Sequence, residues 1–429
     1  MGNLKSRLNE IDPYNLIYSI ILLFNNFVHG YNATIIGTTL VDLSFVYNVT
    51  LNTISYISMI IYFGFLIGSL VALTYKRWLN RQLTVICANI LSMVVMTCVP
   101  FYSTIGIAFF AMVLNGFGMG VWVGSCNSWL VEMWPTGNAI ILQLNYVMYG
   151  IGTIIAPSIS APFIYGKAEV DQWNQTITIP MRIQSLAVPF GFNGIVQLIA
   201  PVVLSILYVK NRYRYVVNKN DETESDANEQ QQKTKRQNKI AWRKTKLLIS
   251  GLALAIVVAA KIGYVTYSSA MFQYMEIKLS ASQSAHVMTT FTALYTIGPL
   301  ITAFVSIKLR PDHILSYHYV LIIGSLVLIY LGQNQIILIY LGSGILGFSI
   351  SVMWPAMIAF TEYYLKLNDR VNAIYCFLLG IFNLIIPFIL SQTFYSNPLI
   401  LIYLELTFII ISLMLFVIIR TWIGCTNLV

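Results

Sequence analysis

Long apolar runs separated by short polar breaks make up most of the chain. Each run is close to the roughly 20 residues that a helix needs to cross the hydrocarbon core of a bilayer. The pattern therefore predicts a series of membrane-spanning helices. Twelve runs occur, at residues 14–38, 53–75, 83–102, 104–132, 138–164, 187–209, 247–271, 285–307, 314–332, 335–361, 371–394 and 398–420.

One polar segment, 210–246, divides the runs into six before it and six after it. It contains 11 of the 25 Lys and Arg residues and 5 of the 16 Asp and Glu residues of the chain. Such a segment cannot bury enough apolar surface to offset the entropy lost on ordering, so we expect a mostly disordered linker. The expected organisation is an N-terminal six-helix bundle at 1–209 and a C-terminal six-helix bundle at 247–429.

The composition agrees with an all-α membrane protein. The chain is 57% hydrophobic and 10% charged, with a mean hydropathy of +0.73, whereas a soluble domain has roughly 25% charged residues. The net charge of +9 is concentrated in the loops, which favours a lipid surface as partner rather than a nucleic acid. The five cysteines are scattered without the spacing of a metal site or a disulfide framework.

The distribution of Lys and Arg predicts the orientation. If both termini are cytoplasmic, 21 of these residues lie in inner loops or at inner helix ends and three lie on the outer side. The glycosylation sequons beginning at Asn48 and Asn174 then fall in outer loops, so we expect both to carry glycans. We expect a monomeric, multi-pass protein of the plasma membrane.

The two halves share a pattern of small residues and charges. A small residue at every fourth position lets a second helix approach closely. Each stripe ends near a carboxylate, and the loop after the second run of each half is basic. Two parallel six-helix repeats are one architecture of secondary transporters. The stripes are Gly116, Gly120, Gly124 and Ser128 in the first half, and Ser343, Gly347, Ser351, Pro355 and Ala359 in the second.

Four short stretches resemble known motifs. Residues 37–43 (GTTLVDL) are similar to G-P-x-L-x-D-L, and 68–81 resembles a loop 2–3 motif in which Lys76 replaces the usual Asp. Residues 150–157 resemble a helix 5 Gly/Pro pattern, and 353–362 a helix 10 segment. Together they resemble the major facilitator superfamily, closest to its sodium-dependent glucose transporter-like branch. The resemblance implies alternating-access transport of a monosaccharide or similar small polar solute. The altered loop 2–3 motif favours the alternative, a transport-inactive scaffold or channel-regulatory protein.

Polar side chains within the apolar runs are costly in lipid unless they face a cavity or a partner. Amide and tyrosine groups suit sugar hydroxyls, and the resemblance implies a cavity lined by runs 1, 4, 5, 7, 8, 10 and 11. The alternative is that single polar residues join helices, and that Trp354 packs beside Pro355. The candidate substrate-binding residues are Asn25, Asn26, His29, Asn127, Gln143, Asn145, Lys261, Tyr264, Tyr267, Ser268, Trp354 and Asn383.

Lys261 lies within the seventh run, roughly 21 Å from its inner end at 1.5 Å per residue. The resembling branch carries an acidic residue there, and a lysine repels the cation that an acid attracts. The ammonium could replace a coupling ion or bind an anionic group of the substrate, and both options predict transport without sodium dependence. The alternative is a lysine that extends to the outer surface.

Charged residues at the inner face are candidate gates or ordinary anchors at the membrane surface. They are Arg77, Arg81, Glu132, Glu362 and Arg370.

No enzyme signature is present, because the four histidines form no metal-binding pattern and no phosphate-binding Gly-rich loop occurs. We therefore expect neither catalysis nor a bound metal or cofactor.

Overall fold

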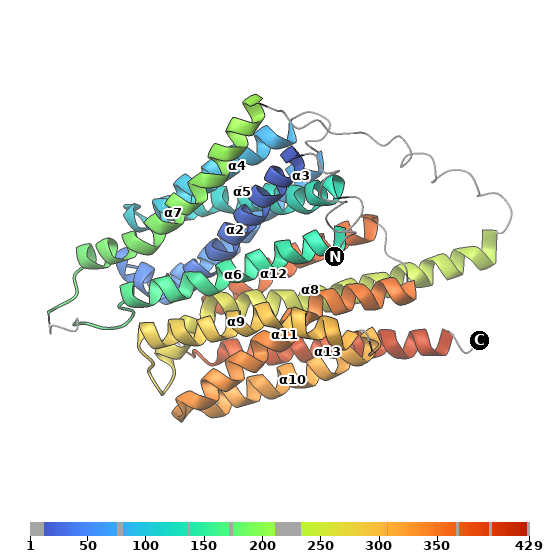
Figure 1. Ribbon diagram of the computed structural model, residues 1–429. Coiled ribbons are helices and arrows are strands. Elements are labelled where there is room, and N and C mark those ends of the chain that lie inside the picture. The colour runs from blue at the N-terminus through green and yellow to red at the C-terminus, as the bar shows by residue number, and fades with distance from the viewer. Residues whose placement is uncertain are drawn as a thin grey trace.

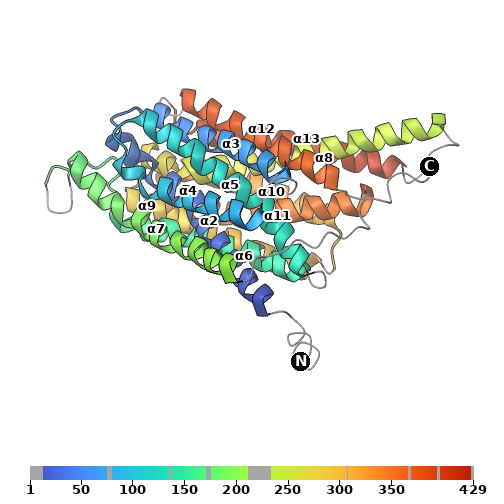
Figure 2. The same ribbon diagram turned by 90° about the horizontal axis from the view of Figure 1, so that it is seen from above.

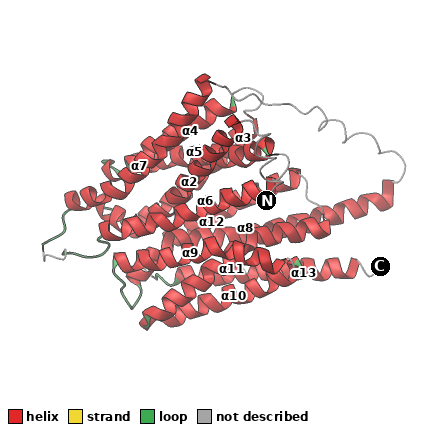
Figure 3. Cartoon of the chain, in the orientation of Figure 1, coloured by secondary structure: helices red, strands yellow, loops and turns green. Residues whose placement is uncertain are grey.

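The protein consists of long helices, with no β-strand among the residues described (Figure 3). The computed structural model describes residues 13–74, 80–134, 138–170, 175–210, 233–306, 308–365, 369–393 and 397–426. The first half contains α2 (Pro13–Val46), α3 (Leu51–Thr74), α4 (Arg81–Thr97), α5 (Ile105–Met133), α6 (Asn138–Ser160) and α7 (Ile179–Lys210). The second half contains α8 (Lys233–Tyr274), α9 (Ala281–Ser306), α10 (Pro311–Leu331), α11 (Ile336–Leu365), α12 (Asp369–Thr393) and α13 (Ile400–Thr426).

Each predicted run corresponds to one of these helices, which confirms the all-α fold with twelve long helices in the described chain. Eight of the described helices are long and apolar enough to cross a membrane. Several helices extend beyond the apolar runs: α2 continues to Val46 and α7 begins at Ile179. Part of the expected linker, 233–246, is helical, because this basic stretch lacks Gly and Pro and is rich in good helix formers.

Glycines bring helices of the same half into close contact. A Cβ atom on Gly116 of α5 would lie 1.9 Å from the carbonyl oxygen of Ile61 in α3. A Cβ atom on Gly347 of α11 would lie 2.2 Å from the carbonyl oxygen of Phe291 in α9. Both glycines belong to the small-residue stripes, so the stripes mark where backbones pack together.

The two halves meet along α2, α3 and α6 on one side and α8, α9 and α12 on the other (Figures 1 and 2). We call the end of the bundle with Lys210 and Lys233 the linker end, and the opposite end the far end. Hydrogen bonds join the halves near the far end. The Tyr267 hydroxyl donates to the carbonyl oxygen of Ser55 at 2.6 Å, and the hydroxyls of Ser158 and Thr289 are 3.3 Å apart. This conformation is therefore closed at the far end.

Candidate functional site

A cavity of about 490 Å³, its opening included, lies where the halves meet. Helices α2, α3 and α5 of the first half and α8 of the second form its walls. Six of its ten lining residues carry polar side-chain groups, which is unusual for the interior of a membrane protein. The lining residues are His29, Asn32, Ala33, Ile36, Ser58, Ile61, Tyr62, Asn115, Met119 and Thr266.

His29 is held in place by groups behind the cavity wall. Its Nε2 atom lies 3.3 Å from Oδ1 of Asn89, which also accepts a hydrogen bond from Nδ2 of Asn25 at 3.1 Å. Because Asn89 Oδ1 can only accept, Nε2 carries the proton and Nδ1 is left with a lone pair. The imidazole stacks on the indole of Trp122, with ring centroids 5.1 Å apart. The ring is therefore fixed in position and presents an acceptor.

Asn25, Asn26 and Asn145 are buried behind this wall. Asn26 donates from Nδ2 to the carbonyl oxygen of Asn145 at 2.7 Å and accepts from Nε1 of Trp122 at 3.2 Å. These contacts join α2 to α5 and α6. In this conformation the three amides position the helices and His29, whereas His29 itself lines the cavity.

Five of the six polar residues that line this cavity were not among the predicted binding residues, and Asn32 and Asn115 are two of them. Asn32 follows His29 by three positions, so the helical period places both on one face, and this signal could have identified it. Asn115 Oδ1 accepts from the Ser92 hydroxyl at 2.6 Å, which leaves its amide N–H groups for the cavity. The Ser92 contact depends on how α4 packs against α5, so the sequence pattern does not reveal it.

A second cavity of about 240 Å³, its opening included, adjoins the first at Ala33, which lines both. Lys261 lies in this second cavity, where its Nζ atom is 4.9 Å from the ring centroid of Tyr295 and 5.8 Å from that of Tyr149. The cavity lies between α2 and α6 of the first half and α8 and α9 of the second. It is lined by Ala33, Thr34, Tyr149, Thr153, Lys261, Val265, Phe291, Thr292 and Tyr295.

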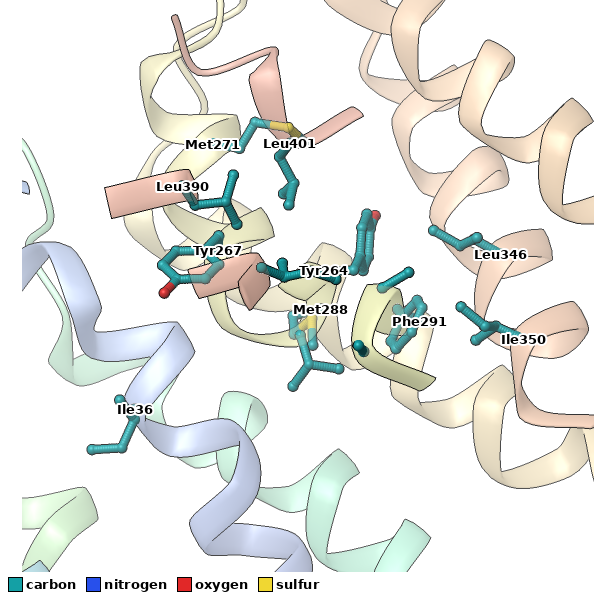
Figure 4. Packing of buried hydrophobic residues seen from close by; sticks show 14 of the residues in the cluster. Ile36, Tyr264, Tyr267, Met271, Met288, Phe291, Leu346, Ile350, Leu390 and Leu401 are labelled. Atoms are coloured by element: carbon teal, nitrogen blue, oxygen red, sulfur yellow. The ribbon is translucent and has the colours of Figure 1, made fainter. Parts of the chain in front are cut away.

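Tyr264, Tyr267 and Ser268 do not line these two cavities in this conformation. The hydroxyl of Tyr264 is 2.7 Å from that of Ser343 inside the second half, and its ring packs among buried apolar side chains (Figure 4). Tyr267 contacts the first half near the far end, as described above. Ser268 is fully buried and donates to Sδ of Met288.

The remaining candidates fall into two groups. Asn383 is buried in α12, and Trp354 is half-buried against the apolar core. The side chains of Asn127 and Gln143 lie outside the described residues.

Two of the candidate gating residues form an ion pair. Arg81 Nη1 donates to Glu132 Oε2 at 2.8 Å, with 8% and 20% of the two side chains exposed. The pair joins α4 to α5 within the first half and so does not itself connect the halves. Residue Arg77 and the side chains of Glu362 and Arg370 lie outside the described residues.

A buried ion pair near the far end was not predicted. Asp42 and Arg182 are 1% and 4% exposed and form a salt bridge. Asp42 also accepts from the backbone N–H of Gly166 at 2.8 Å, and Arg182 donates to the carbonyl oxygens of Gly166 and Ala168, both at 2.8 Å. The apolar run begins after Arg182, so the charge pattern predicts an outer-loop position for this residue, whereas it lies within α7. The pair fixes the loop between α6 and α7.

This loop packs against the second half. Gly166 has a φ of 61°, and a Cβ atom there would lie 2.1 Å from Oε1 of Gln273. The Lys167 ammonium lies 3.7 Å from the ring centroid of Tyr274. Burial lowers the pKa of Lys167, and the charge of Lys278 lowers it further. The loop therefore contributes to closure at the far end.

The sequon residue Asn48 is exposed in the turn after α2, and Asn174 lies outside the described residues. Among the described residues, no three or more His, Cys, Asp or Glu side chains are grouped so that they could hold a metal ion.

Comparisons with known proteins identify the family to which this chain belongs. The model of the Major Facilitator Superfamily matches residues 22–387. Major facilitator superfamily domain-containing protein 4A of Xenopus tropicalis is 22% identical over 390 residues, covering 78% of each chain. The mouse protein of the same name is 21% identical over 453 residues, covering 91% of this chain and 89% of its own. Major facilitator superfamily domain-containing protein 4B of Danio rerio is 19% identical over 409 residues, covering 82% of this chain and 76% of its own.

Solved structures with the same fold include two transporters. A D-xylose-proton symporter superposes with a TM-score of 0.68 at 12% identity, covering 94% of this chain and 96% of its own. The nucleoside transporter NupG superposes with a TM-score of 0.65 at 13% identity, covering 94% and 99%. At these identities the likeness concerns the fold.

Proposed function

The chain belongs to the major facilitator superfamily, and we propose that it transports a monosaccharide or similar small polar solute across a membrane by alternating access. The observation that carries this proposal is the pair of adjoining cavities between the halves, closed at the far end and lined by hydroxyl, amide, imidazole and ammonium groups. Such groups hydrogen-bond a hydroxylated solute, and a site between two rocking halves is where alternating access requires it. The named activities of the xylose and nucleoside transporters with this fold are in keeping with a hydroxylated solute.

We further propose that transport does not depend on sodium. Lys261 places a positive charge in the second cavity, and no carboxylate of a described residue lies within 4.0 Å of it. A cation would be repelled from such a site. On this point the protein would differ from the sodium-dependent glucose transporter-like branch that its motifs resemble.

The remaining assignments are parts of the same proposal. The chain is a multi-pass membrane protein, and we propose that it acts as a monomer in the plasma membrane with both termini in the cytoplasm and glycans at Asn48 and Asn174. The linker end is then the cytoplasmic end. We also propose that Arg81 and Glu132 take part in gating there, although they pair within one half.

The second candidate is a transport-inactive scaffold or channel-regulatory protein with the same fold. Lys76, which stands where the loop 2–3 motif has an Asp, is the observation that favours it. Uptake distinguishes the two. The purified full chain in proteoliposomes is given a panel of radiolabelled hexoses, pentoses, nucleosides and sugar acids, in sodium and then in choline medium. We expect saturable uptake of at least one solute at equal rates in both media. Uptake that requires sodium refutes the coupling proposal, and no uptake of any solute supports the scaffold.

A further inference from the structure

We propose that the two adjoining cavities together recognise a polyhydroxy monocarboxylate, such as a sugar acid, with its carboxylate on Lys261. The inference rests on the proposed transport function and narrows its substrate class. It requires a cation without an internal counter-ion, room for a single negative charge, and a polar surface beside it for hydroxyl groups.

Among the residues that the structure describes, the ammonium of Lys261 has aromatic neighbours but no carboxylate partner. Tyr149 and Tyr295 lie with their ring centroids 5.8 and 4.9 Å from Nζ. Cation–π contacts of this kind offset only part of the desolvation of a lysine. A further anionic group in the cavity would complete the site.

Glu405, the carboxylate buried in α13, is not the missing counter-ion. A Cβ atom on Gly263 would lie 3.7 Å from Oε1 of Glu405, so this carboxylate contacts α8 at Gly263. Lys261 precedes Gly263 by two residues, which is about 200° around an α-helix, so the two groups lie on opposite sides of α8. Asp42 is engaged by Arg182. The described carboxylates of the helices lining these cavities thus leave the charge of Lys261 uncompensated.

The surroundings favour a monoanion. The other residues that line the second cavity are threonines, tyrosines and apolar side chains, so Lys261 is the only cation among them. A phosphate with nearly two charges is usually bound by several cations or by a guanidinium fork. A carboxylate needs one ammonium and hydroxyl donors such as those of Tyr149 and Tyr295.

The adjoining cavity supplies the hydroxyl recognition. Asn115 offers amide N–H donors, and His29 offers the Nδ1 lone pair as an acceptor. Ala33 lines both cavities, so in this proposal one small solute spans them. The site therefore has a cationic end and a neutral polar end.

Binding and uptake by the full-length protein test this assignment. The probes are D-glucuronate, its uncharged methyl ester, D-glucose and acetate. Binding is followed by calorimetry in detergent, and uptake is measured with labelled glucuronate and labelled glucose in proteoliposomes. We expect glucuronate to bind more tightly than the other three, because only glucuronate engages both ends of the site. Equal binding of glucuronate and its ester overturns the proposal without any variant being needed. Equal binding of acetate overturns the hydroxyl recognition.

Variants at Lys261 assign the effect to its charge. Lys261→Gln should weaken glucuronate binding roughly 10- to 100-fold, as expected for loss of a charge-assisted hydrogen bond, and leave glucose binding unchanged. Lys261→Arg should retain part of the preference. Lys210→Gln, at the exposed end of α7, is the matched control and should behave as the unaltered protein. Unchanged glucuronate binding in Lys261→Gln overturns the proposal.

The outcomes also separate this inference from the function on which it rests. Uptake of glucose with no preference for glucuronate leaves the transporter and overturns the sugar-acid assignment. Absence of uptake of both labelled sugars, with the full panel also negative, overturns the proposed function and this inference with it.

Discussion

The buried ion pair between Asp42 and Arg182 gives the sharpest prediction about stability. Asp42→Asn keeps the shape of the side chain but leaves the guanidinium buried, with only carbonyl oxygens as acceptors. Removing one partner of a buried pair costs about 3–5 kcal/mol, because the remaining charge is uncompensated. We expect Asp42→Asn to lower the thermal unfolding midpoint of the detergent-solubilised protein by about 5 °C or more.

An ion pair with one exposed partner provides the control, and its carboxylate, Asp312, keeps a second partner in Arg420 at 3.2 Å. Arg310 is 60% exposed and lies 3.5 Å from Asp312 at the linker end, so Arg310→Gln should cost at most about 1 kcal/mol. The double variant Asp42→Asn/Arg182→Gln should be less destabilised than the sum of the two single variants, because the double variant leaves no lone buried charge whereas each single variant does. Equal midpoints for Asp42→Asn and Arg310→Gln, or strict additivity in the double variant, would refute the reasoning.

Three further predictions concern gating, conformation and topology. Glu132→Gln, which breaks the pair with Arg81, should change the turnover number of transport more than the apparent affinity; a change in affinity alone contradicts a gating role. Gly37→Val should disfavour the conformation closed at the far end, because a Cβ atom at Gly37 would lie 2.4 Å from a carbonyl oxygen of α8 in the other half. Increased labelling of cysteines introduced at the far end reports this change of conformation. Gly106→Ala should have no effect, because no atom lies within 4 Å of a Cβ atom at Gly106. Asn48→Gln should remove a glycan, seen as a gel shift after glycosidase treatment; an unchanged mobility contradicts the outward assignment.

The helices themselves were predictable because each needs only a long apolar run, a signal contained in neighbouring residues. The charged positions near helix ends were not. Asp42 lies after the first apolar run and Arg182 before the sixth, yet each is buried because the other is present. Such pairing joins residues distant in the chain, so hydropathy does not reveal it.

The site was predictable in part for the same reason. The polar face of the first run pointed to His29, and the isolated charge pointed to Lys261, and both line the cavities. Tyr264, a candidate binding residue on the same run as Lys261, does not line the cavity in this conformation. Val265 lies beside Lys261 there, and the Tyr264 hydroxyl contacts that of Ser343. Helical periodicity alone cannot decide whether the residue three or the residue four positions after Lys261 lies beside it in the cavity.

Locking the far end tests the central claim of alternating access. The hydroxyls of Ser158 and Thr289, from opposite halves, are 3.3 Å apart, so cysteines at both positions lie within reach of a disulfide. Uptake of a labelled solute that the unaltered protein transports is measured for Ser158→Cys/Thr289→Cys after oxidation and again after reduction, with the two single variants as controls. The account predicts that oxidation stops uptake in the double variant alone and that reduction restores it. Full cross-linking with undiminished uptake would contradict it, because the solute would then cross without opening of the far end.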